Sequence, residues 1–479
     1  MAHRALLCLA VIGLLLVHPN AHARGPEPLA QTIANLVRQA GLGDGIGIHV
    51  VRLHDGLELY RNRPERPLNP ASNQKLLTAA AALRLLGPDF RATTKVEGII
   101  ENGHVAELVV RPSGDPSLGY ANLAALAEAL HLRGVDTVDR ITIDDSYFDA
   151  EILPPGFEQQ PHEAAAFRAA ISAFAVDHNS YVVNLGPGPR VDAPGRVRVL
   201  AGDYVQIDNR SVTTAAGPPT PRIEHSLTED GHLLIRVEGT VPQQVRTLYY
   251  RRRVPEPKAY AASLLVRALR TAGVAGAMSV RYGAAAQKQP LIADMPSPPL
   301  SVLLYSVGKW SDNFTAEMLL KIMGAQAETP GTSARGAAVV REELTKMGVD
   351  TKGLVMVNGS GLFDGNQVAP RHLTETLLAV YRDPAIRAEY VAHLAVAGAD
   401  GTLGSRIEDL PRPRMVRAKT GTLRDVVALS GYVFGEPRRS VAFSFLANGI
   451  AGKQANAKKL ADDLVRALAD YAIQPELAH

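Results

Sequence analysis

The chain has 479 residues, of which 46% are hydrophobic and 21% are charged, which excludes a disordered, collagen-like or coiled-coil protein. This length is too great for one ordinary compact domain and predicts two or three. A net charge of +3 gives no basic surface of the kind that binds nucleic acid, and the single cysteine, Cys8, excludes a disulfide framework and a cysteine-based metal site.

The first 23 residues have the pattern of a signal peptide. Arg4 supplies a positive charge, an apolar run of 13 residues extends from Ala5 to Val17, and Ala21-His22-Ala23 forms an A-x-A cleavage site. A buried core helix is the alternative, but the position at the very start of the chain disfavours it. The run is too short to span a bilayer and no later stretch approaches 18 apolar residues, so we expect an exported protein without a transmembrane anchor.

Four elements are predicted before residue 90. Apolar residues at helical spacing predict a helix from Leu29 to Ala40. The segment from Gly45 to Tyr60 predicts two strands joined by an Asp55-Gly56 turn. An Ala- and Leu-rich helix is predicted from Ala71 to Leu86, where Gly87-Pro88 stops it.

The middle of the chain is predicted to be rich in strands and to form one or two inserted modules. Thr93 to Arg111 indicates a hairpin that turns at Asn102-Gly103. Gly186 to Leu248 carries repeated turn signals between short strand patterns. The other elements predicted in this block are a helix at 122–133, a strand at 140–143 and a helix at 257–272.

Helices return after residue 300, and strands follow near the end of the chain. The predicted helices are Leu300–Leu304, Phe314–Met323, Gly336–Met347 and Arg371–Tyr381. Three sequential antiparallel strands are predicted at Met415–Thr422, Val426–Phe434 and Ser440–Leu446. A last amphipathic helix, from Gln454 to Tyr471, has both signs of charge on its polar face, which favours packing on the core over a membrane surface.

The first of three chemical motifs is Ser72-Asn73-Gln74-Lys75, at the start of the predicted helix 71–86. Residues i and i+3 share a helix face, so the amine of Lys75 can reach the hydroxyl of Ser72. A desolvated lysine near another cation has a lowered pKa and can act as a base, and the helix N-terminus presents N–H groups suited to an oxyanion. The chain holds a second S-x-x-K, from Ser306 to Lys309, so this motif alone is a weak signal.

The second motif is Ser311-Asp312-Asn313, directly before the predicted helix that starts at Phe314. These are preferred N-cap residues and Glu317 follows, so helix capping is one interpretation, and it is compatible with a catalytic loop. The third motif, Lys419-Thr420-Gly421-Thr422, falls on a predicted strand. The glycine lets a ligand backbone approach, and a lysine with two hydroxyls suits a carboxylate.

In this order, the three motifs are those of penicillin-binding proteins and class A β-lactamases. The gap from Ser72 to Ser311 is 239 residues and that from Ser311 to Lys419 is 108, whereas a β-lactamase has a much shorter first gap. With this insertion the chain resembles the D-alanyl-D-alanine carboxypeptidase/endopeptidase family, the low-molecular-mass class C penicillin-binding proteins of the DacB type. Further segments that match the family are Gly114-Asp115-Pro116-Ser117-Leu118, Asp144–Phe148, Ser172–Asn179, Gly359-Ser360-Gly361-Leu362 and Asp400-Gly401-Thr402-Leu403.

The resemblance implies an α+β fold with a serine β-lactamase/DD-peptidase-like catalytic domain, in which helices flank an antiparallel sheet and form a helical subdomain. This domain would be split between residues 24–92 and 290–479, with the strand-rich module or modules inserted at 93–289. Phe157, the loop from Asn358 to Phe363, and Gly404-Ser405-Arg406 depart from the family pattern.

The resemblance also implies roles for the motif residues. Ser72 would attack the carbonyl of the penultimate D-Ala of a peptidoglycan stem peptide, and Lys75 would take its proton. The backbone N–H groups of Ser72 and Thr422 would form the oxyanion hole. Ser311 would relay a proton to the leaving amine, and Asn313 would orient the base and the substrate amide. The terminal carboxylate would bind to Lys419, Thr420 and Thr422 beside Gly421, and the Lys419 charge would lower the pKa of Lys75.

Several alternatives stay open at this stage. The same motifs serve a β-lactamase, and a non-catalytic peptidoglycan-binding protein could keep the fold. A histidine base for Ser72 is also open, as are the deacylation base, the oligomeric state and the choice between carboxypeptidase and endopeptidase. No H-E-x-x-H or zinc-like histidine spacing occurs, so we expect no metal or other cofactor. The expected partners are stem peptides and β-lactam antibiotics, and the expected location is a Gram-negative periplasm.

Overall fold

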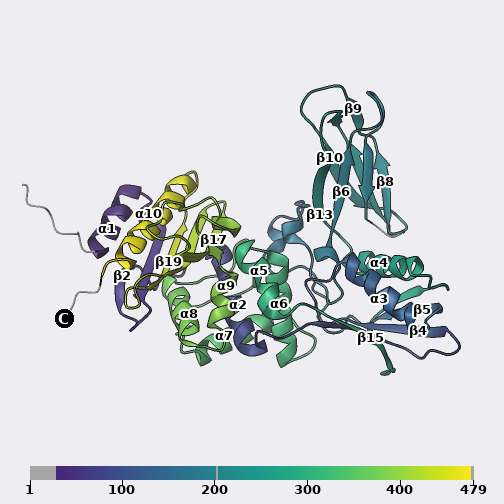
Figure 1. Ribbon diagram of the computed structural model, residues 1–479, viewed down its shortest axis with the longest axis horizontal. Helices are drawn as coiled ribbons and strands as arrows, with labels where there is room; N and C mark the ends of the chain where they lie inside the picture. The colour runs from purple at the N-terminus through teal and green to yellow at the C-terminus, as the bar shows by residue number, and fades with distance from the viewer. Residues whose placement is uncertain (1–28, 201–202, 476–479) are drawn as a thin grey trace, which may run out of the picture.

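The structure, a computed structural model, describes residues 29–200 and 203–475. The predicted signal peptide at 1–23 lies outside the described residues. Figure 1 shows two halves side by side: elements from both ends of the chain make one half, and the middle of the chain makes the other, with a strand-rich lobe rising from it. The fold is α+β, as predicted.

A six-stranded antiparallel sheet is the frame of the first half. Its strands are ordered β16 (Ala395–Val396), β17 (Val416–Leu423), β18 (Val426–Val433), β19 (Val441–Asn448), β1 (Ile46–Arg52) and β2 (Glu58–Asn62). The three late strands pair in sequence, as their patterns predicted. The first strand of the chain then pairs with the last, Ile46 opposite Ala447, which brings the two ends of the chain into one sheet.

Helices cover both faces of this sheet because its strands bury side chains on both sides. On one face lie α1 (Leu29–Ala40) and α10 (Gln454–Ala472), whose buried residues share a core with Ile48 and Phe445. On the other face lie α8 (Pro370–Arg382) and α2 (Gln74–Leu86), in a second core with Ala442 and Leu446.

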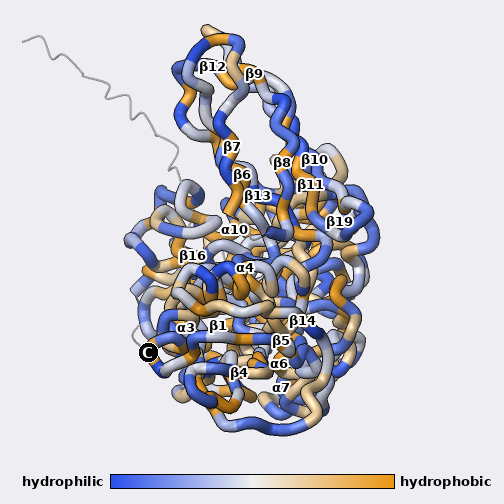
Figure 2. Tube along the Cα trace, turned by 90° about the vertical axis from the view of Figure 1, so that its right-hand side faces the viewer, coloured by the Kyte–Doolittle hydropathy of each residue, from blue (hydrophilic) through white to orange (hydrophobic). Residues whose placement is uncertain are grey.

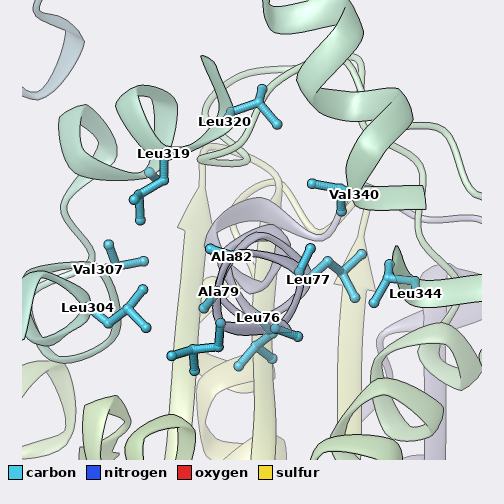
Figure 3. Close-up of a cluster of buried hydrophobic side chains, with 14 of the residues drawn as sticks. Leu76, Leu77, Ala79, Ala82, Leu304, Val307, Leu319, Leu320, Val340 and Leu344 are labelled. Carbon is cyan, nitrogen blue, oxygen red and sulfur yellow. The ribbon is translucent and has the colours of Figure 1, made fainter. Parts of the chain in front are cut away.

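Helix α2 runs through the middle of the helical layer. Ten of its 13 residues are buried, including the run Ala79 to Ala82, whose small side chains let neighbouring helices approach closely. Figure 3 shows α2 surrounded by side chains such as Leu304, Leu319 and Val340. These come from α5 (Leu300–Lys309), α6 (Asn313–Ala327) and α7 (Ser333–Lys346). This packing holds the N-terminal end of α2, where Ser72 and Lys75 lie, in a rigid frame.

The second half contains a five-stranded sheet and two helices. The strand order is β14 (Ser279–Tyr282), β5 (Thr137–Ile143), β4 (His104–Arg111), β3 (Thr93–Glu97) and β15 (Leu291–Pro296). The chain enters this sheet through β3 and leaves through β15, and these two strands pair antiparallel. Its helices are α3 (Tyr120–Leu132) and α4 (Pro257–Thr271), which pack on each other. The boundaries of the inserted module or modules stay a prediction.

Eight short strands make the lobe, which projects beyond the body of the molecule in Figure 2. Tyr181 and Val183 on one of its sheets and Ile235 on another share the core of the five-stranded sheet. The lobe strands are β6 (Ser180–Gly186), β7 (Arg196–Val199), β8 (Val205–Asn209), β9 (Val212–Thr214), β10 (Arg222–Leu227), β11 (Leu233–Glu238), β12 (Thr240–Pro242) and β13 (Leu248–Arg253).

Several helices differ from the predictions at their ends: α6, for example, continues to Ala327, beyond the predicted end at Met323. The helix predicted at Leu300–Leu304 continues to Lys309, and α9 (Arg387–His393) has no predicted counterpart. Helix α9 is only seven residues long, and its buried residues are Tyr390 and His393. Because both side chains carry polar atoms, the segment shows no apolar helical pattern. Within 29–200 and 203–475, no helix is both long and apolar enough to cross a membrane.

Candidate active site

Ser72 lies in a tight turn, Ala71–Asn73, that leads directly into α2. Ala71 takes a left-handed conformation with φ of 44°, and its N–H donates to the side-chain oxygen of Asn69 at 2.9 Å. The backbone nitrogen of Ser72 faces strand β17: a Cβ added to Gly421 would lie 3.0 Å from it. Glycine at 421 thus allows the strand to pass against the Ser72 amide.

The amine of Lys75 meets three acceptors. Its Nζ lies 3.1 Å from Ser72 Oγ, 2.7 Å from Asn313 Oδ1 and 2.6 Å from the carbonyl oxygen of Ser360. The Lys75 side chain is fully buried. The predicted Ser–Lys pair is therefore formed, and Asn313, distant in sequence, orients the amine as well.

Burial lowers the pKa of Lys75 to about 7, against the opposing effect of the Glu317 and Asp312 carboxylates. Desolvation was one of the two expected causes of this shift, and the other, the charge of Lys419, is not among its main causes. Burial, and then the charge of Lys75, hold the pKa of Lys419 well below its ordinary value. The neutral form of Lys75, which a base requires, is accessible near neutral pH.

The second motif turns sharply before α6. Ser311 is left-handed, with φ of 61°, and its Oγ accepts a hydrogen bond from Lys419 Nζ at 2.8 Å. Such a conformation is costly for a serine and is found preferentially at functional sites. Asp312 caps α6 by accepting from the Thr315 N–H at 2.6 Å, so the capping interpretation also holds. Asn313 donates to the carbonyl oxygen of Phe167 at 2.9 Å.

The third motif lies on β17, next to the short edge strand β16. Lys419 is fully buried, and its Nζ donates to the carbonyl oxygen of Thr420 as well as to Ser311. The Asn73 side chain donates to the Lys419 carbonyl oxygen at 3.0 Å, which joins this strand to the turn that holds Ser72. The hydroxyl of Thr420 donates to Thr402 at 2.8 Å. The three motifs thus meet at one place through hydrogen-bonded side chains.

The other S-x-x-K segment has a structural role. Ser306 donates to the Leu303 carbonyl oxygen at 2.9 Å, as a serine inside a helix does. Lys309 pairs with Asp400 at 2.8 Å and donates to the Leu394 carbonyl oxygen. These contacts fix the loop that contains Thr402, so this pair supports the site from outside.

Two groups that surround the site were not predicted from the sequence. One is the Ser360 carbonyl oxygen, which binds Lys75 through the backbone and so has no side-chain signal. The other is Glu317, which does not complete a capping box but lies buried and accepts from the N–H groups of Gly359 and Ser360. Two departures from the family pattern, Phe157 and Phe363, pack edge to face with ring centroids 5.8 Å apart.

Histidine takes no direct part in the contacts of Ser72 in the described structure. His178 stacks on Phe314, with ring centroids 5.1 Å apart, and its Nδ1 lies 3.7 Å from an Asp312 carboxylate oxygen. Burial lowers the pKa of His178. Ser72 has its side-chain hydrogen bond with Lys75.

Comparison with known proteins identifies the family of this chain. Residues 29–471 match the model of the D-Ala-D-Ala carboxypeptidase 3 (S13) family. The chain belongs to this family. Its members are serine peptidases, and the DacB-type class C penicillin-binding proteins predicted from the motifs are the relatives found.

Alignments with individual relatives cover most of this S13 chain. It is 36% identical over 446 residues to a D-alanyl-D-alanine carboxypeptidase from Actinomadura sp., covering 89% of this chain and 81% of the relative. It is 27% identical over 424 residues to the Haemophilus influenzae D-alanyl-D-alanine carboxypeptidase DacB, covering 87% and 88%. The crystal structure of penicillin binding protein 4 (dacB) from H. influenzae matches with a TM-score of 0.76 at 24% identity, over 91% of this chain and 99% of that chain, which confirms the fold.

Proposed function

We propose that this S13 chain hydrolyses peptide bonds that follow a D-Ala carbonyl in peptidoglycan, through an acyl-enzyme on Ser72. The substrates are the D-Ala-D-Ala terminus of stem peptides and the D-Ala–diaminopimelate cross-link, which share the acyl group and differ in the leaving amine. The observation that carries the proposal is the buried Lys75 amine 3.1 Å from Ser72 Oγ, with a pKa of about 7. A non-catalytic binding protein has no need of this arrangement.

Acylation begins when neutral Lys75 takes the proton of Ser72. The Ser72 Oγ then forms a bond to the D-Ala carbonyl carbon, and the carbonyl oxygen becomes an oxyanion. The backbone N–H groups of Ser72 and Thr422 stabilise it, as the closeness of β17 to the Ser72 amide supports. The proton passes to the leaving nitrogen with the help of Ser311, and the C–N bond breaks.

Residues of β17 and Asn313 orient the substrate, with Asn313 contacting the substrate amide. A D-Ala terminus presents a carboxylate, which Lys419, Thr420 and Thr422 bind by charge and hydroxyl donors. Because Lys419 contacts Ser311, the carboxylate site and the proton relay are joined by one hydrogen bond of 2.8 Å. Water then attacks the ester on Ser72, the acid product leaves, and the serine hydroxyl is restored.

β-Lactams resemble the acyl-D-Ala-D-Ala group and should acylate Ser72 to give a stable ester. The H. influenzae penicillin binding protein 4 structure has also been determined in complex with a β-lactam, which supports this inhibition by analogy. We further propose export to the periplasm by the signal peptide at 1–23, since peptidoglycan lies outside the inner membrane. A β-lactamase reading gains no support from the family match.

Labelling with a fluorescent penicillin tests the mechanism. The wild-type protein should carry a stable fluorescent adduct, and Ser72→Ala should carry none; a labelled Ser72→Ala protein, or an unlabelled wild type, contradicts the proposal. Purified cross-linked sacculus fragments then separate the two activities. Release of D-Ala shows carboxypeptidase activity, conversion of cross-linked dimers to monomers shows endopeptidase activity, and Ser72→Ala is the control for both.

A further inference from the structure

Glu317 is a buried carboxylate with an uncommon set of partners. It lies in the second turn of α6, is 1% exposed, and forms no ion pair within the described residues. One oxygen accepts from the Ser360 N–H at 2.7 Å and the other from the Gly359 N–H at 3.0 Å. The Ser360 hydroxyl also donates to it. A carboxylate is rarely buried unless its oxygens have hydrogen-bond or charged partners, because removing its charge from water is costly.

The loop at residues 359–361 contacts both Glu317 and Lys75. Ser360 donates its N–H to Glu317, and its carbonyl oxygen accepts from Lys75 Nζ at 2.6 Å. Thr78 of α2 fixes the same loop by donating to the Gly359 carbonyl oxygen at 2.8 Å. Gly361, left-handed with φ of 73°, packs so tightly on the turn before α2 that an added Cβ would lie 1.9 Å from a backbone oxygen there. The loop is thereby fixed between α6 and α2.

The partners of Glu317 are all donors, which favours the ionised carboxylate. Burial raises the pKa of Glu317, while the three donors and the charge of Lys75 oppose this effect. The charged groups around the Lys75 amine are then two carboxylates, Glu317 and Asp312, and one amine, Lys419. His178 also lies close by and faces Asp312.

We propose that Glu317 is a positioning residue for the general base: it fixes the loop whose Ser360 carbonyl holds Lys75, and its negative charge stabilises the ammonium that forms when Lys75 takes the Ser72 proton. The inference rests on the proposed role of Lys75. No bond to Glu317 forms or breaks, and it exchanges no proton during the reaction. Its effect resembles that of a buried carboxylate behind a catalytic base, transmitted here through one peptide unit and through space.

The test compares penicillin acylation rates over pH 5 to 9 for the wild type, Glu317→Gln and Thr78→Val. Glutamine keeps the shape and one acceptor but removes the charge, so the acylation rate on the pH plateau should fall at least about 10-fold. Because a nearby negative charge raises the pKa of a lysine, its removal should move the acid limb about one pH unit towards acid. Thr78→Val loosens the same loop without a change in charge, so its acid limb should stay at the wild-type pH.

Three results would overturn the proposal: a wild-type rate and acid limb in folded Glu317→Gln, a lower rate with an unmoved limb, or an equal displacement in Thr78→Val. Thermal unfolding checks that each variant is folded. If Glu317→Gln does not fold, Glu317→Asp takes its place, with slower acylation and an unmoved limb expected; an unchanged rate or a displaced limb contradicts the inference. Labelling of Ser72→Ala distinguishes failure of the proposed function from failure of this inference alone.

Discussion

The pH dependence of acylation is the prediction that depends most directly on the environment of Lys75. A lysine in water has a pKa of about 10.4, so only about one amine in 2,500 is neutral at pH 7. The buried Lys75, with a pKa of about 7, is about half neutral at that pH. Burial therefore increases the fraction of usable base by about a thousandfold.

The sign of the effect follows from the role of the base. Below the pKa, Lys75 carries its proton and accepts none from Ser72, so the acylation rate should fall about tenfold for each pH unit below about 6.5. Stopped-flow measurement of penicillin acylation from pH 5 to 8, with circular dichroism to confirm folding, gives the profile.

A histidine titrates in the same range and needs its own control. His178 has a left-handed φ of 58°, which asparagine tolerates, so His178→Asn removes the imidazole while keeping the turn. The acid limb should persist near pH 7 in this variant. A limb that disappears with His178, a limb near pH 4.5 typical of a carboxylate, or a rate that does not change with pH would refute the assignment of Lys75 as the base.

Three further predictions concern single side chains. Gly421→Ala places a methyl group 3.0 Å from the Ser72 nitrogen and should lower the acylation rate about tenfold in a folded protein, as stopped-flow labelling would show. Lys419→Ala should raise KM more than it lowers kcat for D-Ala-D-Ala peptides, because it removes the charge that binds the carboxylate; an unchanged KM contradicts this. Asp149→Asn leaves the buried Lys321 without its counter-charge and should cost about 3 kcal/mol in denaturant unfolding, whereas a loss below about 1 kcal/mol would show that the pair is dispensable.

The sequence predicted the parts of the fold that depend on local pattern. The helix from Leu29 to Ala40 and the strands of the late meander lie where their periodicity and turns placed them. What the pattern could not show is which distant strands pair. The pairing of β1 with β19 and of β3 with β15 depends on contacts between residues hundreds of positions apart, and only the folded chain reveals them.

In the active site too, some features could be predicted from the sequence and others could not. Side-chain motifs indicated Ser72, Lys75, Asn313 and Lys419, because each contributes a functional group that chemistry requires at a known spacing. The Ser360 carbonyl oxygen is backbone and could belong to any residue type, so no letter of the sequence marks it. Desolvation was expected to lower the pKa of Lys75, but the sequence could not show that Lys75 is fully buried, since burial depends on the packing of helices and a sheet around it.

The most direct test of the account is to locate the penicilloyl group on the intact protein. After incubation with penicillin, digestion and mass spectrometry should find one acyl group, on Ser72, and none in Ser72→Ala. Acylation of Ser306, the serine of the other S-x-x-K segment, or modification at a residue outside the three motifs would contradict the central claim that Ser72 is the nucleophile.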